Sequence, residues 1–281
     1  MRQIGVIGGD RRQAILAELL AEDGAEVCTY GLGEWSRREK PLAETVAADV
    51  VVLPLPLCWR DGILNCGEGE IKTRDLFAML NPEQLVLAGQ VKPGQLREAE
   101  DCGLLLRDYF LREEMTVANA AATAEAAIQV AMERLDRTLL GTDCLVLGFG
   151  RIGKLLSFRL HGLGGRVTAT ARKPADLAWI DAFGWRALET GGIRRELHRF
   201  PVVFNTIPSL IINEELLRRM PEGCLLVDLA SVQGVDETAA AALGVRYMWA
   251  RGLPGKLVPL TAAMAIHRAV CALLQEREGS S

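Results

Sequence analysis

The sequence lacks paired cysteines, and this absence removes two common ways of stabilising a chain. Its seven cysteines are scattered over 281 residues, are odd in number and never occur as C-x-x-C. A disulfide framework or a zinc site of the finger type is therefore not expected. We predict buried or half-buried thiols in a reducing compartment, and no bound metal.

Long hydrophobic runs are also missing. The longest stretch without a charged residue covers residues 200–213 and contains two prolines, so no segment fits a membrane span. The chain enters a strand-like apolar run at residues 3–7 without the apolar region and cleavage site of a secretory signal. These absences predict a cytoplasmic protein.

Positive charge is not in excess. The net charge is −4, and a chain without a basic field is a poor partner for nucleic acid. Apolar residues make up 49% of the sequence and charged residues 24%, which is the profile of a globular protein long enough for two domains. Nucleic acid is therefore excluded as a bulk partner.

The chain does contain a repeated unit of strand, glycine turn and helix. Residues 4–10 and residues 144–150 are apolar runs that end in glycines, and each leads into a helical pattern. This order of elements is typical of a parallel sheet with crossover helices. The sequence therefore predicts an α/β protein.

The N-terminal half continues this alternation. Further strands are predicted at residues 26–30, 50–54, 85–87 and 104–107. Helices are predicted to begin near Thr73, which can act as a cap, and to cover residues 95–102. Five short strands with helices between them indicate a flavodoxin-like sheet. Residues 55–71 fit no regular pattern and are predicted to form a long loop of the kind that is often functional.

The C-terminal half has the same character. An alanine-rich helix that links the halves is predicted at residues 120–135, and a final helix at residues 259–275 has a proline in its first turn. The pattern does not decide which half the final helix packs against. Strands are predicted at residues 144–147, 166–171, 202–206, 225–229 and 245–248. The predicted domains are a flavodoxin-like substrate domain (1–118), a linking helix (119–140), a Rossmann dinucleotide-binding domain (141–256) and a closing helix with tail (257–281).

The second glycine run carries a dinucleotide fingerprint. Gly148, Gly150 and Gly153 form G-x-G-x-x-G between an apolar strand and a helix. In such a unit the first glycine permits the tight turn, the second lets a pyrophosphate approach the backbone, and the third allows helix and strand to pack closely. The alternative is a glycine-rich turn with a structural purpose only.

The end of the next strand predicts which dinucleotide is bound. An NAD site places Asp or Glu there, whereas this strand ends in Arg172 and Lys173 with no carboxylate. Two cations suit the 2′-phosphate of NADP. NADP is therefore predicted over NAD, the alternative being a solvated basic turn.

Polar residues end the following two strands at the same predicted edge. Thr206 and Pro208 follow one strand and Ser231 follows the next, so they are expected to line the nicotinamide half of the crevice, although they could be ordinary strand caps. The predicted cofactor contacts are Gly148, Phe149, Gly150, Arg151, Ile152, Gly153, Arg172, Lys173, Asn205, Thr206, Pro208, Ala230 and Ser231.

The first glycine run lacks the third glycine, so a second dinucleotide is not expected there. Its backbone donors lie beside Arg11 and Arg12 and are predicted to hold a small anionic group such as a substrate carboxylate. The alternative is a plain helix start with Asp10 as its cap.

The motifs together resemble the family of dipicolinate synthase A-subunits from about residue 4 to residue 274. They are IGGDxRQ at 7–13, NxxxTAE at 119–125, GFGRIG at 148–153, NTIPS at 205–209, DLAS at 228–231, and GLPG at 252–255 followed by Pro259 and Thr261. The resemblance implies the layout of D-2-hydroxyacid dehydrogenases. It also implies NADP-linked oxidation of a dihydrodipicolinate-type lysine-pathway intermediate to pyridine-2,6-dicarboxylate in spore-forming bacteria. A flavoprotein-like second subunit is implied as partner, and a homo-oligomer is expected.

The same resemblance suggests residues for substrate and proton. The predicted substrate contacts are Gly9, Asp10, Arg12, Gly252, Pro254 and Gly255, and the predicted catalytic set is Asn119, Thr123, Glu125 and His267. Either of the last two could accept the proton, although a Glu in such a helix often makes an interhelix contact and His267 is more typical of a structural residue. The sequence departs from the family at Val232-Gln233, which leaves no arginine just after Ser231 to clamp a carboxylate.

Two other functions stay open. One is an NADP-dependent D-2-hydroxyacid dehydrogenase-like oxidoreductase, which normally needs an Arg, a Glu and a His in the second half. The other is a non-catalytic subunit that binds NADP.

Overall fold

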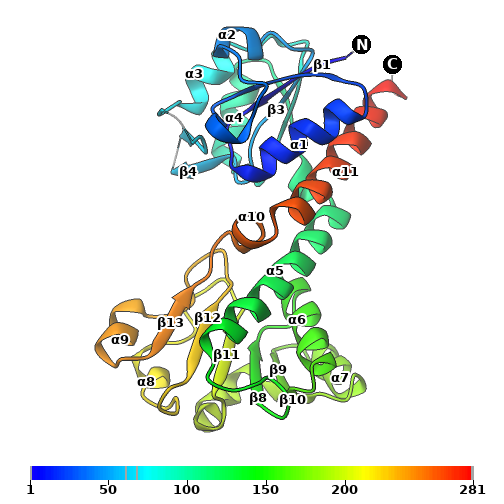
Figure 1. The fold of residues 1–281 in the computed structure, drawn as a ribbon. Helices are drawn as coiled ribbons and strands as arrows, with labels where there is room; N and C mark the ends of the chain where they lie inside the picture. The colour runs from blue at the N-terminus through cyan, green and yellow to red at the C-terminus, as the bar shows by residue number, and fades with distance from the viewer. Residues whose placement is uncertain (1, 61, 68, 280–281) are drawn as a thin grey trace. The chain divides into compact units, whose positions relative to one another are not determined.

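The chain folds into two compact units. The computed structural model describes residues 2–60, 62–67 and 69–279, and it divides into Met1–Asn119 with Val258–Ser281, and Ala120–Leu257. Each unit has its own parallel sheet (Figure 1). Among the described residues, no helix has the length and apolar character needed to span a membrane.

The first unit contains a five-stranded sheet in the order β2-β1-β3-β6-β7. Neighbouring strands are all parallel, and in chain order this arrangement is 2-1-3-4-5, the flavodoxin-like order that the sequence predicts. The strands are β1 (Gln3–Ile7), β2 (Glu26–Tyr30), β3 (Val50–Val52), β6 (Leu85–Ala88) and β7 (Leu105–Asp108). The helices are α1 (Arg11–Glu22), α2 (Leu42–Thr45), α3 (Thr73–Ala78), α4 (Pro93–Asp101) and α11 (Pro259–Glu278), with 3-10 turns η1 (Gly33–Trp35) and η2 (Tyr109–Leu111).

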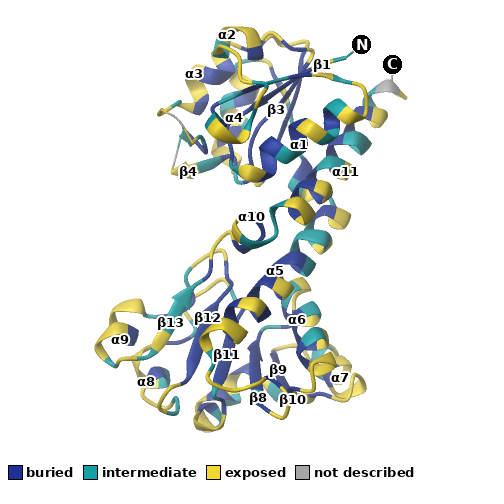
Figure 2. Ribbon diagram, viewed as in Figure 1, coloured by how far each residue is buried: buried dark blue, intermediate teal, exposed yellow. Residues whose placement is uncertain are grey.

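Both faces of this sheet are buried, which explains its unbroken apolar strands. In β3, Val50 and Val52 pack with residues of α1 and α11, whereas Val51 packs with residues of α3 and α4. Successive side chains of a strand point to opposite faces, so a strand covered on both sides must be apolar throughout. Figure 2 shows the strands as the buried centre of each unit.

Helix α11 belongs to the first unit, which settles a point that the sequence pattern leaves open. It lies against α1, and its buried face includes Ile266 and Val270 in the same core as Leu16 and Leu20 of α1. The last helix of the chain therefore completes the cover on one face of the first sheet.

Two local predictions need correction. The segment 55–71 contains an antiparallel pair, β4 (Cys58–Arg60) and β5 (Ile63–Leu64), rather than loop alone. Thr73 does not cap α3: it is the first helical residue after the cap position, and its hydroxyl donates to Glu98 Oε2 at 2.8 Å. In both cases contacts distant in sequence decide the local structure.

The second unit contains a six-stranded parallel sheet in the order β10-β9-β8-β11-β12-β13. In chain order this is 3-2-1-4-5-6, the arrangement of Rossmann dinucleotide-binding domains, as predicted. The strands are β8 (Asp143–Leu147), β9 (Arg166–Ala171), β10 (Arg186–Glu189), β11 (Val202–Asn205), β12 (Leu225–Asp228) and β13 (Arg246–Trp249). The helices are α5 (Glu113–Arg134), which continues from the first unit, α6 (Arg151–Gly162), α7 (Pro174–Ala182), α8 (Glu214–Leu217), α9 (Glu237–Ala242) and α10 (Leu253–Leu257), with 3-10 turns η3 (Thr190–Arg195) and η4 (Leu197–Arg199).

Strand β10 and the first turns of α5 were not predicted. Strand β10 has a charged residue at each end and only two apolar residues between them, so its sequence carries little strand signal. Its pairing with β9 decides its conformation. Helix α5 begins at Glu113 rather than near residue 120, with two glutamates in its first turn, where carboxylates favour a helix N-terminus.

Truncation of Ile266 is expected to destabilise the first unit. This side chain of α11 is fully buried against the sheet, so Ile266→Ala should lower the free energy of unfolding of that unit by about 2–4 kcal/mol. Met264→Ala on the exposed face of the same helix is the control and should change it by less than about 1 kcal/mol. Chemical denaturation followed by circular dichroism measures both, and equal effects would contradict the assigned packing.

Candidate functional site

The turn between β8 and α6 admits no side chain at two of its glycines. Gly148 has a φ of +96°, and a Cβ there would lie 2.6 Å from Thr206 Oγ1. A Cβ at Gly153 would lie 2.2 Å from the carbonyl oxygen of Gly148. These two glycines therefore let helix α6 start directly against the sheet, which is the packing role that the fingerprint predicts.

Gly150 differs from its neighbours because it faces open space. No atom lies within 4 Å of an ideal Cβ at this position, and Gly150 is the N-cap of α6 without any side-chain hydrogen bond to the helix. The first backbone N–H groups of a helix and its dipole favour an anion. The 12-residue helix α6 thus offers a phosphate-sized anion site with an unobstructed approach.

Hydrogen bonds from neighbouring strands hold this turn in place. The backbone N–H of Gly148 donates to Thr170 Oγ1 at 3.1 Å, and Thr206 Oγ1 donates to the carbonyl oxygen of Leu147 at 2.8 Å. Strands β8 and β11 flank the point where the strand order reverses, the place where open parallel sheets bind ligands. Thr206, predicted as a cofactor contact, therefore also fixes the glycine turn.

The turn also brings an aromatic ring and a cation together. Phe149 packs edge-on to Trp185 with ring centroids 6.3 Å apart, and Lys154 Nζ lies 5.1 Å from the centroid of Phe149. Lys154 is one residue beyond the fingerprint, and sequence reasoning missed it. A cation this close to the N-terminus of α6 adds to the positive potential of the anion site.

Arg172 and Lys173 lie where β9 ends, and both are exposed. Within the described residues, neither side chain has a hydrogen bond or ion pair. Arg166, at the start of the same strand, pairs with Asp143 at 2.7 Å. The carboxyl end of β9 therefore presents two uncompensated cations, whereas the amino end does not.

A buried network supports the ends of β11 and β12. Asp228 Oδ1 accepts from Asn205 Nδ2 at 2.9 Å and from the Ala230 N–H at 3.1 Å, and Asp228 Oδ2 accepts from the Gly234 N–H at 2.7 Å. Burial raises the pKa of Asp228, and these three donors oppose that rise. Asn205 is fully buried, and its Oδ1 accepts from the Ile207 N–H at 3.0 Å.

This network changes the interpretation of Asn205. The sequence suggests a cofactor contact, but its side chain is enclosed and its amide is bonded to protein groups. The Asn205 side chain therefore shapes the loop that carries Thr206 and Pro208. Pro208 and Ser231 are exposed and Ala230 is buried at this edge.

The end of β13 adds an arginine that sequence reasoning missed. The guanidinium carbon of Arg251 lies 4.7 Å from the ring centroid of Trp249, and Trp249 Nε1 donates to the carbonyl oxygen of Ala230 at 3.0 Å. Arg251 is exposed and presents a fork of donors at the carboxyl end of the sheet, the chemistry that binds carboxylates. An Arg two residues after a strand-borne Trp was the available signal.

The segment 252–255 is a helix start rather than an open turn. Gly252 has a φ of +66°, and α10 begins at the next residue, with Leu253 and Pro254 buried. The predicted backbone donors for a carboxylate at Gly252, Pro254 and Gly255 are thus partly built into a short helix. Their substrate role stays a prediction.

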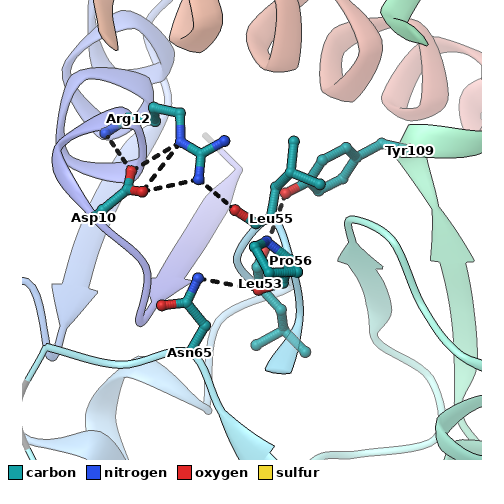
Figure 3. Close-up of polar contacts among 7 residues, drawn as sticks. All are labelled: Asp10, Arg12, Leu53, Leu55, Pro56, Asn65 and Tyr109. Atoms are coloured by element: carbon teal, nitrogen blue, oxygen red, sulfur yellow. Dashed lines mark hydrogen bonds and ion pairs between the residues drawn. The ribbon is translucent and has the colours of Figure 1, made fainter. Parts of the chain in front are cut away.

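The first glycine run ends in an internal ion pair (Figure 3). Asp10 is the N-cap of α1 and accepts from the backbone N–H of Arg12, and its carboxylate also holds the Arg12 side chain, with Nη2 to Oδ2 at 2.8 Å. Arg12 is buried and donates from Nη2 to the carbonyl oxygen of Leu55. The Asp10 cap, one of the two interpretations of the sequence, is therefore present, and it neutralises much of the Arg12 charge.

Nearby groups tie this edge together. Tyr109 is fully buried, its hydroxyl donates to the carbonyl oxygen of Leu53 at 3.1 Å, and burial raises the pKa of that hydroxyl. Asn65 Nδ2 donates to the carbonyl oxygen of Pro56 at 3.1 Å (Figure 3). The segment after β3 is thus held by side chains from the hairpin and from η2.

Glu125 makes the interhelix contact that the sequence analysis considers as an alternative. Its Oε1 accepts from Arg159 Nη2 of α6 at 3.0 Å, and its side chain is 64% exposed. Asn119 and Thr123 are one turn apart on α5, so they share a face of that helix. Their catalytic roles stay predictions, while Glu125 has a structural partner.

His267 is held far from the first glycine run. Its Nε2 lies 2.7 Å from Asp23 Oδ2, and Asp23 is the C-cap of α1. Helix α1 separates its N-cap from its C-cap by about 20 Å, so His267 does not meet Arg12. Cys271 is also in contact, and its pKa is raised to about 11 by burial and by Asp23.

Comparison with known proteins agrees with this site and fold. Residues 3–110 match the family described as the N-terminal domain of the dipicolinate synthase A-subunit. The A-subunit of dipicolinate synthase from Bacillus subtilis (strain 168) is 28% identical over 288 residues, covering 98% of this chain and 96% of that protein. The crystal structure of the A-subunit from Bacillus halodurans superposes with a TM-score of 0.87 at 26% identity, covering 97% of each chain.

The chain resembles the A-subunit of dipicolinate synthase over its length. This result confirms the resemblance drawn from the sequence motifs. The D-lactate dehydrogenase of Escherichia coli has a TM-score of 0.66 at 16% identity, covering 99% of this chain and 97% of that chain. It supports the predicted likeness to D-2-hydroxyacid dehydrogenases in fold alone.

Replacement of Asp228 by Asn is expected to weaken the carboxyl edge of the second unit. The new amide would place an N–H donor against the Gly234 or Ala230 N–H, so the free energy of unfolding should fall by about 1–3 kcal/mol. Asp236→Asn is the matched control, because Asp236 caps α9 through one oxygen and Asn caps equally well. Denaturant titration that finds no difference between the two variants would contradict the network.

Proposed function

We propose that the chain is the dehydrogenase subunit of a dipicolinate synthase. It would oxidise a dihydrodipicolinate-type intermediate of the lysine pathway to pyridine-2,6-dicarboxylate with NADP, for sporulation. The observation that carries the proposal is the open anion site at Gly150 in a Rossmann sheet, in a chain that resembles the dipicolinate synthase A-subunit from end to end. Oxidation of a dihydropyridine gains the stability of the aromatic ring, so the protein has chiefly to position two rings in a dry cleft.

The residues of the second unit fit a nicotinamide dinucleotide. The pyrophosphate would approach Gly150 and the first N–H groups of α6, with Lys154 nearby, and Gly148 and Gly153 would keep the backbone close. The dinucleotide would supply a hydride acceptor, and a proton leaves the substrate ring at the same time. Thr206 and Pro208 would border the nicotinamide half of the site.

The basic end of β9 favours NADP over NAD. Arg172 and Lys173 are exposed and uncompensated where an NAD site would place a carboxylate for the ribose hydroxyls. A 2′-phosphate would be held by these two cations.

Arg251 is proposed as a substrate carboxylate contact. The chain has no arginine just after Ser231, and Arg251 supplies one at the end of the neighbouring strand β13, oriented by Trp249. A dicarboxylate needs at least one such fork beside backbone donors.

The second unit is poorly equipped for hydroxyacid oxidation that uses a histidine. Its two histidines are His161, in the last turn of α6, and His198, just before β11, and neither follows the carboxyl end of a strand. This placement favours the dihydropyridine dehydrogenase over a D-2-hydroxyacid dehydrogenase. We further propose a second subunit of flavoprotein type and a homo-oligomer, which the word subunit in the relative's name supports for the former alone.

Calorimetry with both dinucleotides tests the cofactor assignment. The chain should prefer NADP, and Arg172→Ala with Lys173→Ala should weaken NADP binding by about 10- to 100-fold while leaving NAD unchanged, since only NADP carries the 2′-phosphate. Gly150→Ala should weaken both dinucleotides and leave the unfolding midpoint intact, because its Cβ meets no protein atom. Arg199→Ala, an exposed arginine before β11, is the control. Equal affinity for NAD and NADP in the unmodified chain would contradict the assignment.

Steady-state kinetics test the substrate assignment. With dihydrodipicolinate generated from lysine-pathway precursors, the chain should reduce NADP, and Arg251→Ala should raise KM for the acid by about 10-fold or more through loss of a charge-assisted hydrogen bond. Arg251→Lys should recover part of the loss, and NADP affinity should not change. Turnover only after addition of a flavoprotein partner would favour a shared redox step, and dinucleotide binding without any turnover would favour the non-catalytic subunit.

A further inference from the structure

Three potential metal ligands meet on the surface of the first unit, where α1 packs against α11. His267 Nε2 lies 2.7 Å from Asp23 Oδ2, Cys271 Sγ lies 3.5 Å from His267 Nε2, and Cys271 Sγ lies 3.7 Å from Asp23 Oδ2. The three ligand atoms are all within 4.8 Å of one another. This Asp23–His267–Cys271 cluster has no part in the proposed dehydrogenase site.

The fold builds the cluster from two directions. His267 and Cys271 are four residues apart on α11, so their side chains share one face of the helix. Asp23 is the C-cap of α1, and the packing of α1 on α11 brings its carboxylate to that face. Both helices are buried along their other sides in one core, so the three ligands are carried by rigid elements.

The separations match a tetrahedral site of zinc size. Bonds of about 2.3 Å to sulfur and about 2.0 Å to nitrogen and oxygen, at tetrahedral angles, require ligand separations of about 3.5 Å for each pair with sulfur and about 3.3 Å for nitrogen and oxygen. The two separations that involve Cys271 already have this value within about 0.2 Å. The His267–Asp23 pair has to open by roughly half an ångström, which rotation of the exposed Asp23 side chain can provide.

A cysteine nucleophile is the competing explanation, and the geometry disfavours it. A relay of cysteine, histidine and carboxylate uses both ring nitrogens, one toward the nucleophile and one toward the carboxylate. In this cluster Cys271 and Asp23 both face the same atom, His267 Nε2. Such convergence of three donors on one point suits a shared cation rather than a proton relay.

We propose that Asp23, His267 and Cys271 bind one zinc-class divalent cation, with water as the fourth ligand. One thiolate, one imidazole and one carboxylate form a borderline-soft set that favours Zn²⁺ or Co²⁺ over Mg²⁺ and Ca²⁺, which take oxygen ligands. Asp23 is 54% exposed and His267 is 20% exposed, so an ion can reach the cluster from solvent. The ion would clamp α11 to the end of α1 and stabilise the first unit.

Cobalt titration of the metal-free full chain tests the proposal. One equivalent of Co²⁺ should give a sulfur-to-metal charge-transfer band together with the strong visible bands of a four-coordinate ion, and Zn²⁺ should displace it. Cys271→Ser should abolish the charge-transfer band, and Asp23→Asn and His267→Ala should each weaken Co²⁺ binding at least 10-fold. Cys102→Ser and His198→Ala are the controls, a half-buried cysteine and an exposed histidine outside the cluster, and should bind as the unmodified chain does.

Thermal unfolding gives a second readout. A hundredfold excess of Zn²⁺ over its Kd should raise the Tm of the unmodified chain by roughly 5 °C and leave that of Cys271→Ser unchanged, because only the native cluster binds the ion. Circular dichroism of the metal-free variants shows that they remain folded. Absence of a one-equivalent cobalt spectrum in the unmodified chain, or a spectrum that persists in Cys271→Ser, would overturn the proposal.

Discussion

The contact between the backbone at Gly148 and the side chain of Thr206 is the constraint on which the second unit depends. Because no Cβ fits there, the chain can turn directly from β8 into α6 and place the helix N-terminus over the edge of the sheet. Thr170 and Leu147 fix the same turn through hydrogen bonds. The consequence is a rigid set of backbone donors, aimed at one point and formed before any ligand arrives.

The two units use the same edge of a parallel sheet in opposite ways. In the second unit the N-terminus of α6 has no side-chain cap, and Gly150 leaves the approach open. In the first unit Asp10 caps α1 and holds the buried Arg12. A helix N-terminus that already has an internal carboxylate attracts an external anion less strongly than one without. Electrostatics therefore favour the dinucleotide at the second sheet, where the fingerprint lies.

Cations at the second unit's carboxyl edge are arranged for anions. Arg172, Lys173 and Arg251 have no carboxylate partner among the described residues, whereas Arg159, Arg166 and Arg186 on the same unit are all paired. Unpaired cations raise the local potential, and paired ones contribute little beyond local structure. The buried Asn205–Asp228 pair acts differently, since it holds the loops without facing the ligand.

Much of this arrangement follows from the sequence alone. The two sheets, the glycine fingerprint and the cation pair after β9 are written in short local patterns, since alternation, glycine spacing and strand ends need no distant contact to be recognised. Strand β10 and the β4–β5 hairpin depend on pairing partners and were missed. Only the tertiary structure encloses Asn205, pairs Glu125 with Arg159, orients Arg251 on Trp249 and brings Asp23 to His267 and Cys271. Those contacts join residues far apart in the chain, and local propensity carries no information about which distant side chain will lie opposite.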